Sequence, residues 1–320
     1  MFRFAKAKRN RGGRIEPLRI DLRSKSAGVI GHLFMRKTVL IISFLFLGIF
    51  PLVSSEMTLA GKIPENTPRY ISLAPSTTEI LFALGLGDQI VGVSSFCNYP
   101  PQAQNKEKVG DFSRPNIEKI LFLKPDYIFC TGLEQASSVT ELRRLNLKVY
   151  VADPKNIKDL FSSIRDIANI TGKTKEAEGL IKGMQSEIEQ INSKVKLIAE
   201  SKRPKVFIEI WHEPLTTAGK GSFIDEMISL AGGVNIAYDT KRAYSIFSPE
   251  EVIRRNPECI ILAYMDQEKP ATLVAGRFGW KEISAVKNKR LYNDINPDIL
   301  LRPGPRVVKG LKEIYKRLYP

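Results

Sequence analysis

One long amphipathic segment, residues 171–202, constrains the fold more than any other stretch of the chain. Between Ala177 and Ile198 apolar residues recur at alternating steps of four and three, which places one apolar stripe along a helix. Thr174 is a candidate cap, and Pro204 ends the pattern. A helix of about twenty-eight residues would be roughly 42 Å long. An ordinary surface helix has the same pattern, so the flanking segments decide its role.

The segments on either side of this helix follow a common plan. Ser76 with Glu79, and Ser222 with Asp225, resemble capping boxes at equivalent helix starts. At the same offset of 146 residues, Leu84, Gly87 and Ile90 recur as Leu230, Gly233 and Ile236. A second match, at an offset of 132 residues, pairs 116–130 with 248–263, each a short capped helix, a proline and a buried strand.

Strands alternate with helices throughout both segments, which favours parallel sheets with helices on both faces. The sequence therefore predicts an α/β protein with two Rossmann-like lobes, residues 66–170 and 203–320, joined by the backbone helix 171–202. Ligands of open parallel sheets bind beyond the carboxyl ends of the strands. We expect the loops of both lobes to line one cleft.

The first fifty-five residues differ from the rest. They carry eleven Lys or Arg against two acids, a net charge of +9 out of the +15 of the whole chain. A cationic stretch, an apolar run (39–53) and small residues predict a signal peptide at 35–55, cleaved after Ser55, although an uncleaved anchor is an alternative. No Cys near the run offers a lipoprotein modification site. Residues 1–34 are a basic extension or a mis-assigned start.

Composition excludes several functions. Because the basic charge is concentrated in the probable leader, a nucleic-acid partner is not expected. The odd set Cys97, Cys130 and Cys259 excludes complete disulfide pairing and favours buried free thiols at the last two. With only His32 and His212, neither a His-rich metal site nor a Ser-His-Asp triad can be assembled.

The loops predicted at the strand ends, among them 211–221 and 238–247, contain many aromatic residues, which suggests a large, flat, mainly apolar ligand. Any one of these could instead pack on the core. Trp211 is the strongest candidate, because it leaves a predicted strand directly into a Gly- and Pro-rich segment, whereas the role of Trp280 stays open. The candidate ligand contacts are Pro75, Ser76, Phe96, Tyr99, Phe112, Ser113, Trp211, Tyr244 and Phe247.

Several stretches resemble the periplasmic binding proteins for iron complexes and cobalamin, and the resemblance covers about 66–320. These stretches are 69–79, 91–94, 99–100, 115–118, 123–126 and 217–224. The run Trp211-His212-Glu213-Pro214-Leu215 is most similar to the cobalamin-binding branch. The resemblance implies a monomeric, exported, periplasmic protein without a permanent cofactor, which delivers cobalamin to an ABC importer in the inner membrane.

The resemblance also implies that one acid on each lobe docks on the permease, and by position these are Glu118 and Glu250. An acid in a first helical turn is also a common partner of the helix dipole. We expect no enzyme, because Gly85-Leu86-Gly87 follows a helix and so lacks the mechanics of a nucleotide-binding loop.

Other ligands remain open. A haem could use Tyr99, Tyr244 or His212 as an axial ligand, and a ferric siderophore could use Arg114, Arg302 and Arg306. A metal-ion receptor is a weaker alternative, because the loops offer only His212, Glu213 and Asp266.

Overall fold

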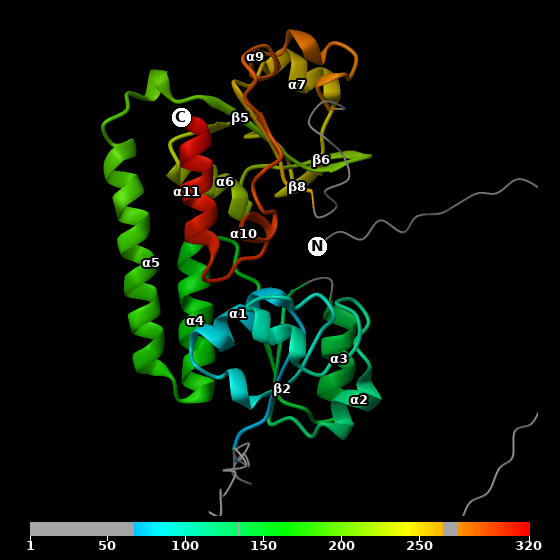
Figure 1. Ribbon diagram of the computed structural model, residues 1–320. Helices are drawn as coiled ribbons and strands as arrows, with labels where there is room; N and C mark the ends of the chain where they lie inside the picture. Colours follow the sequence, from blue (N-terminus) through cyan, green and yellow to red (C-terminus); the bar gives the residue numbers. More distant parts are fainter. Residues whose placement is uncertain (1–66, 133–134, 265–273) are drawn as a thin grey trace, which may run out of the picture. The chain divides into compact units, whose positions relative to one another are not determined.

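The computed structural model describes residues 67–132, 135–264 and 274–320 (Figure 1). The predicted extension and signal peptide, residues 1–55, lie outside these ranges. Within the described part, no helix is both long enough and apolar enough to cross a membrane.

The first lobe contains a four-stranded parallel sheet in the order β2-β1-β3-β4. Its strands are β1 (Tyr70–Ser72), β2 (Ile90–Val93), β3 (Tyr127–Cys130) and β4 (Val149–Val151). Its helices are α1 (Pro75–Ala83), α2 (Ile117–Phe122) and α3 (Ala136–Arg144). The strands are short and their central residues apolar, as expected for a sheet covered on both faces.

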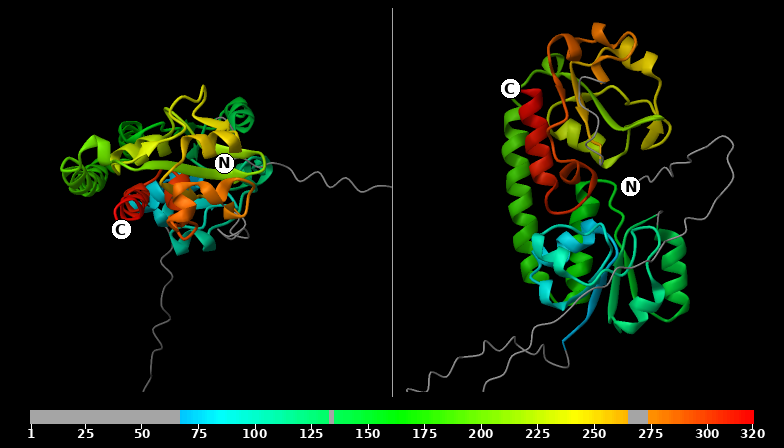
Figure 2. Two further views of the ribbon diagram at one scale, coloured as in Figure 1. Left: turned by 90° about the horizontal axis from the view of Figure 1, so that it is seen from above. Right: turned by 45° about the vertical axis from the view of Figure 1, so that its right-hand side comes forward.

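The connection between the lobes is an antiparallel helical pair, α4 (Ile157–Thr171) and α5 (Thr174–Val195). The long helix α5 is shorter than the predicted range 171–202, because Gly172 ends α4 in the left-handed conformation at φ 73°. Thr174 is its first residue and not its cap. The predicted apolar stripe is buried from Ala177 to Val195 and packs against α4, α6 (Phe223–Leu230) and α11 (Val307–Leu318). Figure 2 shows α5 and α11 side by side.

The second lobe contains a mixed sheet in the order β10-β9-β5-β6-β8, with β7 also paired to β5. Strands β10, β9 and β5 pair in parallel, whereas β6 pairs antiparallel with both β5 and β8. The strands are β5 (Lys205–His212), β6 (Leu215–Ala218), β7 (Val234–Asn235), β8 (Tyr244–Ile246), β9 (Cys259–Leu262) and β10 (Leu291–Tyr292). The remaining helices are α7 (Pro249–Arg255), α9 (Ser284–Lys287) and α10 (Asp298–Leu301).

Two predicted loops of the second lobe are wrong. Trp211 and His212 extend β5 and pair with Thr216 and Leu215 of β6, so residues 211–221 do not form one loop. Residues 244–246, also predicted as loop, pair with β6 as β8. Antiparallel neighbours joined by a tight turn need few residues, and Gly and Pro around them obscured the short strands.

The predicted helix caps are partly confirmed. The Ser222 hydroxyl accepts a hydrogen bond from the Asp225 amide at 3.0 Å, and Ser248 caps α7 in the same way. The predicted capping box at Ser76 is wrong, because α1 starts at Pro75 behind Ala74 and Glu79 binds a distant arginine. Glu251, three residues after Ser248, does not complete a capping box there, because its carboxylate pairs with Arg254 and Arg255.

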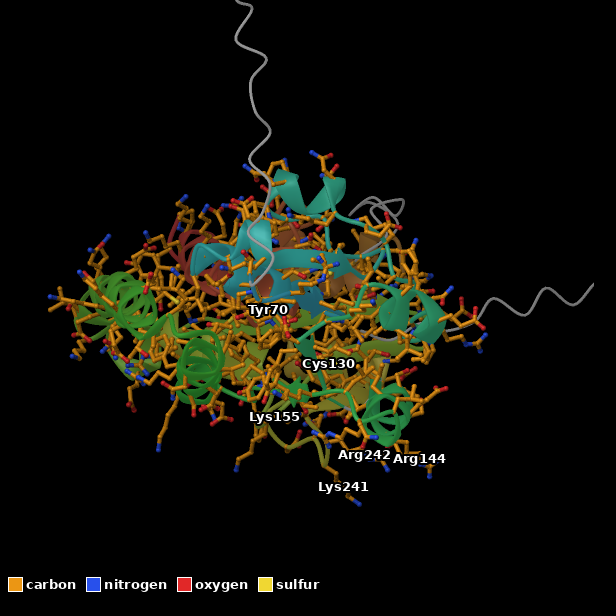
Figure 3. All side chains as sticks on the ribbon, turned by 90° about the horizontal axis from the view of Figure 1, so that it is seen from below. Tyr70, Cys130, Arg144, Lys155, Lys241 and Arg242 are labelled. Atoms are coloured by element: carbon orange, nitrogen blue, oxygen red, sulfur yellow. The ribbon has the colours of Figure 1, made fainter. Side chains whose placement is uncertain are left out.

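The three cysteines are free and buried, which confirms the expectation of buried thiols. Burial raises the pKa of Cys130 and of Cys259 to about 12, so these thiols are protonated and unreactive at neutral pH. Tyr70 and Cys130 are buried, whereas Lys241 and Arg242 are exposed and point outward at the edge of the molecule in Figure 3.

Candidate functional site

Three aromatic rings gather at the carboxyl end of the central strands of the second sheet. Trp211 and His212 are the last residues of β5, and Tyr264 follows β9, which is the parallel neighbour of β5. The Trp211 and His212 ring centroids lie 5.0 Å apart, and His212 meets Tyr264 edge-on at 5.9 Å. The Trp211 indole Nε1 donates a hydrogen bond to the Glu213 carbonyl at 2.8 Å. Trp211 and His212 are half-buried, so part of this cluster reaches the surface.

A buried ion pair between Glu209 and Arg277 contacts this aromatic cluster through Tyr264. Glu209 is completely buried, and its carboxylate accepts hydrogen bonds from two Arg277 nitrogens at 2.8 and 2.7 Å. The Tyr264 hydroxyl donates to the same carboxylate. Burial and the Glu209 charge raise the pKa of Tyr264, so the phenol remains a proton donor at neutral pH. The hydrogen bond to Glu209 fixes the orientation of the Tyr264 ring, which is the ring that contacts His212.

In the first lobe, the loop after β2 is held by two arginines of the segment 302–306. Arg302 donates to the Asn98 amide oxygen at 2.6 Å and pairs with Asp298 at 2.9 Å. Arg306 lies 3.8 Å from the centroid of the Tyr99 ring and forms two hydrogen bonds with Glu79. Two of the three arginines considered for a siderophore are therefore occupied by protein partners, whereas the third, Arg114, is exposed.

The structure brings some predicted contacts to the surface and leaves others inside. Tyr99 and Tyr244 are 36% and 38% exposed, and Phe96 and Ser113 are half-buried. Phe112 is buried in its loop, and its carbonyl accepts a hydrogen bond from the buried Gln135 amide at 2.7 Å.

Three other predicted contacts are buried. Pro75 and Ser76 lie at the start of α1, where a Cβ on Gly304 would stand 3.5 Å from the Ser76 carbonyl oxygen. The Phe247 ring centroid lies 5.8 Å from that of Phe207 in the core of the second lobe, so this ring belongs to the core. Trp280 is fully buried in the same core.

Sequence reasoning missed the ion pair at Glu209 and the partners of Arg302 and Arg306. One signal was present, because Glu209 is the only charged residue in the apolar run 206–210. A buried carboxylate needs a partner, but nothing in the sequence identifies Arg277.

In the described part of the chain, no group of three or more His, Cys, Asp or Glu could hold a metal ion. His212 contacts Trp211 and Tyr264, and Asp266 lies outside the described residues.

The two candidate docking acids occupy equivalent helices. Glu118 is in the first turn of α2 and Glu250 in the first turn of α7, and both are exposed. Neither forms an ion pair with a residue that the structure describes, whereas the adjacent Glu251 pairs with two arginines. Hydrogen bonds hold the pKa of Glu250 below its usual value, and the hydrogen bond from the Ser248 hydroxyl has the largest effect. The Glu250 carboxylate is therefore ionised at neutral pH.

Two α/β lobes bridged by a helix, with aromatic side chains at the strand ends, define a two-lobed solute-binding protein. The chain belongs to the periplasmic binding protein family, whose model matches residues 71–296. This confirms the predicted fold class and family, and with them the expectation of a binding protein in place of an enzyme.

Three known proteins show the range of the likeness. The ABC transporter substrate-binding lipoprotein YvrC of Bacillus subtilis (strain 168) is 35% identical over 85% of this chain and 87% of its own length. The crystal structure of the periplasmic vitamin B12-binding protein BtuF of Vibrio cholerae is 30% identical, with a TM-score of 0.67 over 78% of this chain and 96% of its own. The periplasmic haem-binding protein RhuT of Roseiflexus sp. RS-1 is 25% identical, with a TM-score of 0.69 over 79% of this chain and 98% of its own.

Proposed function

We propose that this protein is the extracytoplasmic substrate-binding component of an ABC importer and that it captures a cobalamin-like corrinoid. The observation that carries the proposal is the placement of Trp211 at the end of β5, half-buried and tilted by 33° against the His212 ring, where an indole can contact a flat ligand. Tyr99 supplies a second partly exposed ring from the first lobe. Similarity to a vitamin B12-binding protein favours this ligand class.

Haem is the second candidate. The likeness to a haem-binding protein favours it, and the exposed phenol of Tyr99 or Tyr244 has the chemistry of an axial ligand. A ferric siderophore has less support, because Glu79, Asn98 and Asp298 occupy the arginines that would meet its negative charge.

Visible absorption distinguishes these ligands. The purified protein is mixed with cyanocobalamin, haemin or a ferric hydroxamate siderophore, separated from free ligand on a desalting column, and scanned. We expect the corrinoid spectrum to co-elute with the protein. Retention of haemin alone, with a shifted Soret band, would transfer the proposal to haem, and retention of none of the three would reject the ligand class.

The export prediction has a direct test. If the apolar run 39–53 acts as a cleaved signal, the mature chain begins near Glu56. Intact-mass spectrometry of protein isolated from the natural host is expected to give a mass without residues 1–55. A mature chain that retains residues 39–53 would instead indicate a membrane anchor.

The docking role proposed for Glu118 and Glu250 predicts separate effects on transport and ligand binding. Both carboxylates are exposed and free of ion pairs among the described residues, so the double change Glu118→Ala/Glu250→Ala is expected to leave fold and ligand affinity intact. Loss of two interfacial charges should reduce complex formation with the permease, and each single change should do less because the other lobe retains its contact.

The measurements are ligand titration on the isolated variant, and uptake in cells that carry the cognate importer. Glu178→Ala/Glu282→Ala is the matched control, because it also removes two exposed acids, from sites where they pair with Arg165 and Lys287. Undiminished uptake with Glu118→Ala/Glu250→Ala would contradict the docking role. An equal loss of uptake with the control Glu178→Ala/Glu282→Ala would contradict it as well.

A further inference from the structure

The Tyr99 ring is covered on one face by a guanidinium from the opposite end of the chain. The Arg306 guanidinium carbon lies 3.8 Å from the ring centroid, which is stacking distance. The tyrosine keeps 36% of its surface exposed, so the guanidinium does not enclose it. One face of the Tyr99 ring therefore packs against Arg306, and part of the side chain remains accessible to solvent.

The guanidinium that supports Tyr99 is itself fixed. Its Nε and one terminal nitrogen donate to the two Glu79 carboxylate oxygens at 2.8 and 2.6 Å, a bidentate pairing. The side chains of Arg306 and Glu79 are 11% and 2% exposed, so water competes little for this pair. One edge of the guanidinium is thus directed at Glu79, while its central carbon lies over the Tyr99 ring.

The residue before Tyr99 is anchored by the same segment. Arg302 is 7% exposed and donates to the Asn98 amide oxygen at 2.6 Å. Asp298 holds the Arg302 guanidinium at 2.9 Å. The Asn98 side chain and the Tyr99 ring are therefore both held by arginines that follow α10.

From this geometry we infer that Arg306, oriented by Glu79, is a positioning residue that sets the Tyr99 ring for the ligand and does not itself touch the ligand. The inference rests on the proposed function, since it assigns a role within the same binding site. A ring held in place before binding loses less conformational freedom when the ligand arrives, which raises affinity. An arginine that donated hydrogen bonds directly to the ligand would act whether or not Tyr99 is present.

A double-mutant cycle in ligand affinity separates these two roles. Arg306→Lys keeps a positive charge beside Glu79 but removes the planar guanidinium and its bidentate pairing. With cyanocobalamin as the probe, Arg306→Lys is expected to raise the Kd about tenfold in the natural background and less than about twofold in the Tyr99→Ala background. Glu79→Gln, which keeps the side-chain shape, should give the same pattern, and it serves if Arg306→Lys does not fold.

Arg317→Lys is the matched control, because Arg317 also lies over a tyrosine, Tyr292, at 5.4 Å and pairs with Asp294 at 2.7 Å. It should leave the Kd unchanged in both backgrounds, which excludes a general effect of losing a stacked arginine.

Two outcomes overturn the inference. Equal loss of affinity in both Tyr99 backgrounds would show that Arg306 acts independently of the ring, while the proposed function stands. Absence of binding of cyanocobalamin, haemin and a ferric siderophore by the unmodified protein would reject the proposed function together with this role.

Discussion

Replacement of Glu209 by Ala is expected to lower the free energy of unfolding by about 3 to 5 kcal/mol, because it removes one partner of a buried ion pair. Glu209 is completely buried in the central strand β5, and its carboxylate is shared by Arg277 and the Tyr264 hydroxyl. Without the Glu209 carboxylate, the Arg277 guanidinium and the Tyr264 hydroxyl lose their shared acceptor. Only 25% of the Arg277 side chain is exposed to water that could replace it. Urea unfolding followed by circular dichroism measures the change.

Two further variants interpret this result. Glu209→Gln keeps an acceptor for Tyr264 but loses the charge, so it should fall between the natural protein and Glu209→Ala. Glu178→Ala breaks the exposed pair with Arg165, and it should hardly move the unfolding midpoint, because solvent screens exposed pairs. If Glu209→Ala unfolds at the same urea concentration as the natural protein, the network is not a stabilising element.

Replacement of Trp211 by Ala is expected to weaken binding of the transported ligand by about 2 kcal/mol, roughly thirtyfold in Kd. The indole is half-buried at the end of β5, and the ring contributes stacking area that Ala cannot replace. Titration calorimetry gives the affinity, and a melting curve recorded on the same sample gives the stability.

Two matched variants distinguish a ligand contact from a core residue. Trp211→Phe keeps an aromatic face but loses the hydrogen bond to the Glu213 carbonyl, so it should recover most of the affinity. Trp280→Phe alters a fully buried indole and should lower stability with little change in Kd. If Trp211→Ala lowers the melting temperature but keeps the Kd, then Trp211 belongs to the core.

The sequence predicted the parts of the fold that follow from local periodicity. The apolar stripe from Ala177 to Val195 and the repeat of α2-β3 as α7-β9 are visible because a helix and a buried strand each impose a short spacing. Strands β6 and β8 were missed because their pairing depends on neighbours and because Gly and Pro near them suggested a loop.

The candidate site was harder to predict because its contacts join distant segments. Glu79 looked like the acid of a capping box, three residues after Ser76, but its partner Arg306 lies 227 positions away. Tyr99 and Trp211 could be selected as aromatics near strand ends, but no spacing rule reveals that Arg306 covers one of them. Phe247 met the same rule and packs in the core, because position in a loop does not determine the direction of a side chain.

The contacts of the segment 302–306 have a consequence for the order in which the chain can fold. A ribosome makes the first lobe early, and domains generally fold as units in that order. Here, however, Asn98 and Glu79 bind Arg302 and Arg306, which are synthesised 204 and 227 residues later. Until then the Glu79 carboxylate lacks the Arg306 guanidinium that neutralises its charge in the folded protein. The first lobe therefore reaches its final packing only when almost the whole polypeptide is available. The export proposed for this chain would benefit from such late packing, since a first lobe that has not completed its contacts can cross a membrane unfolded.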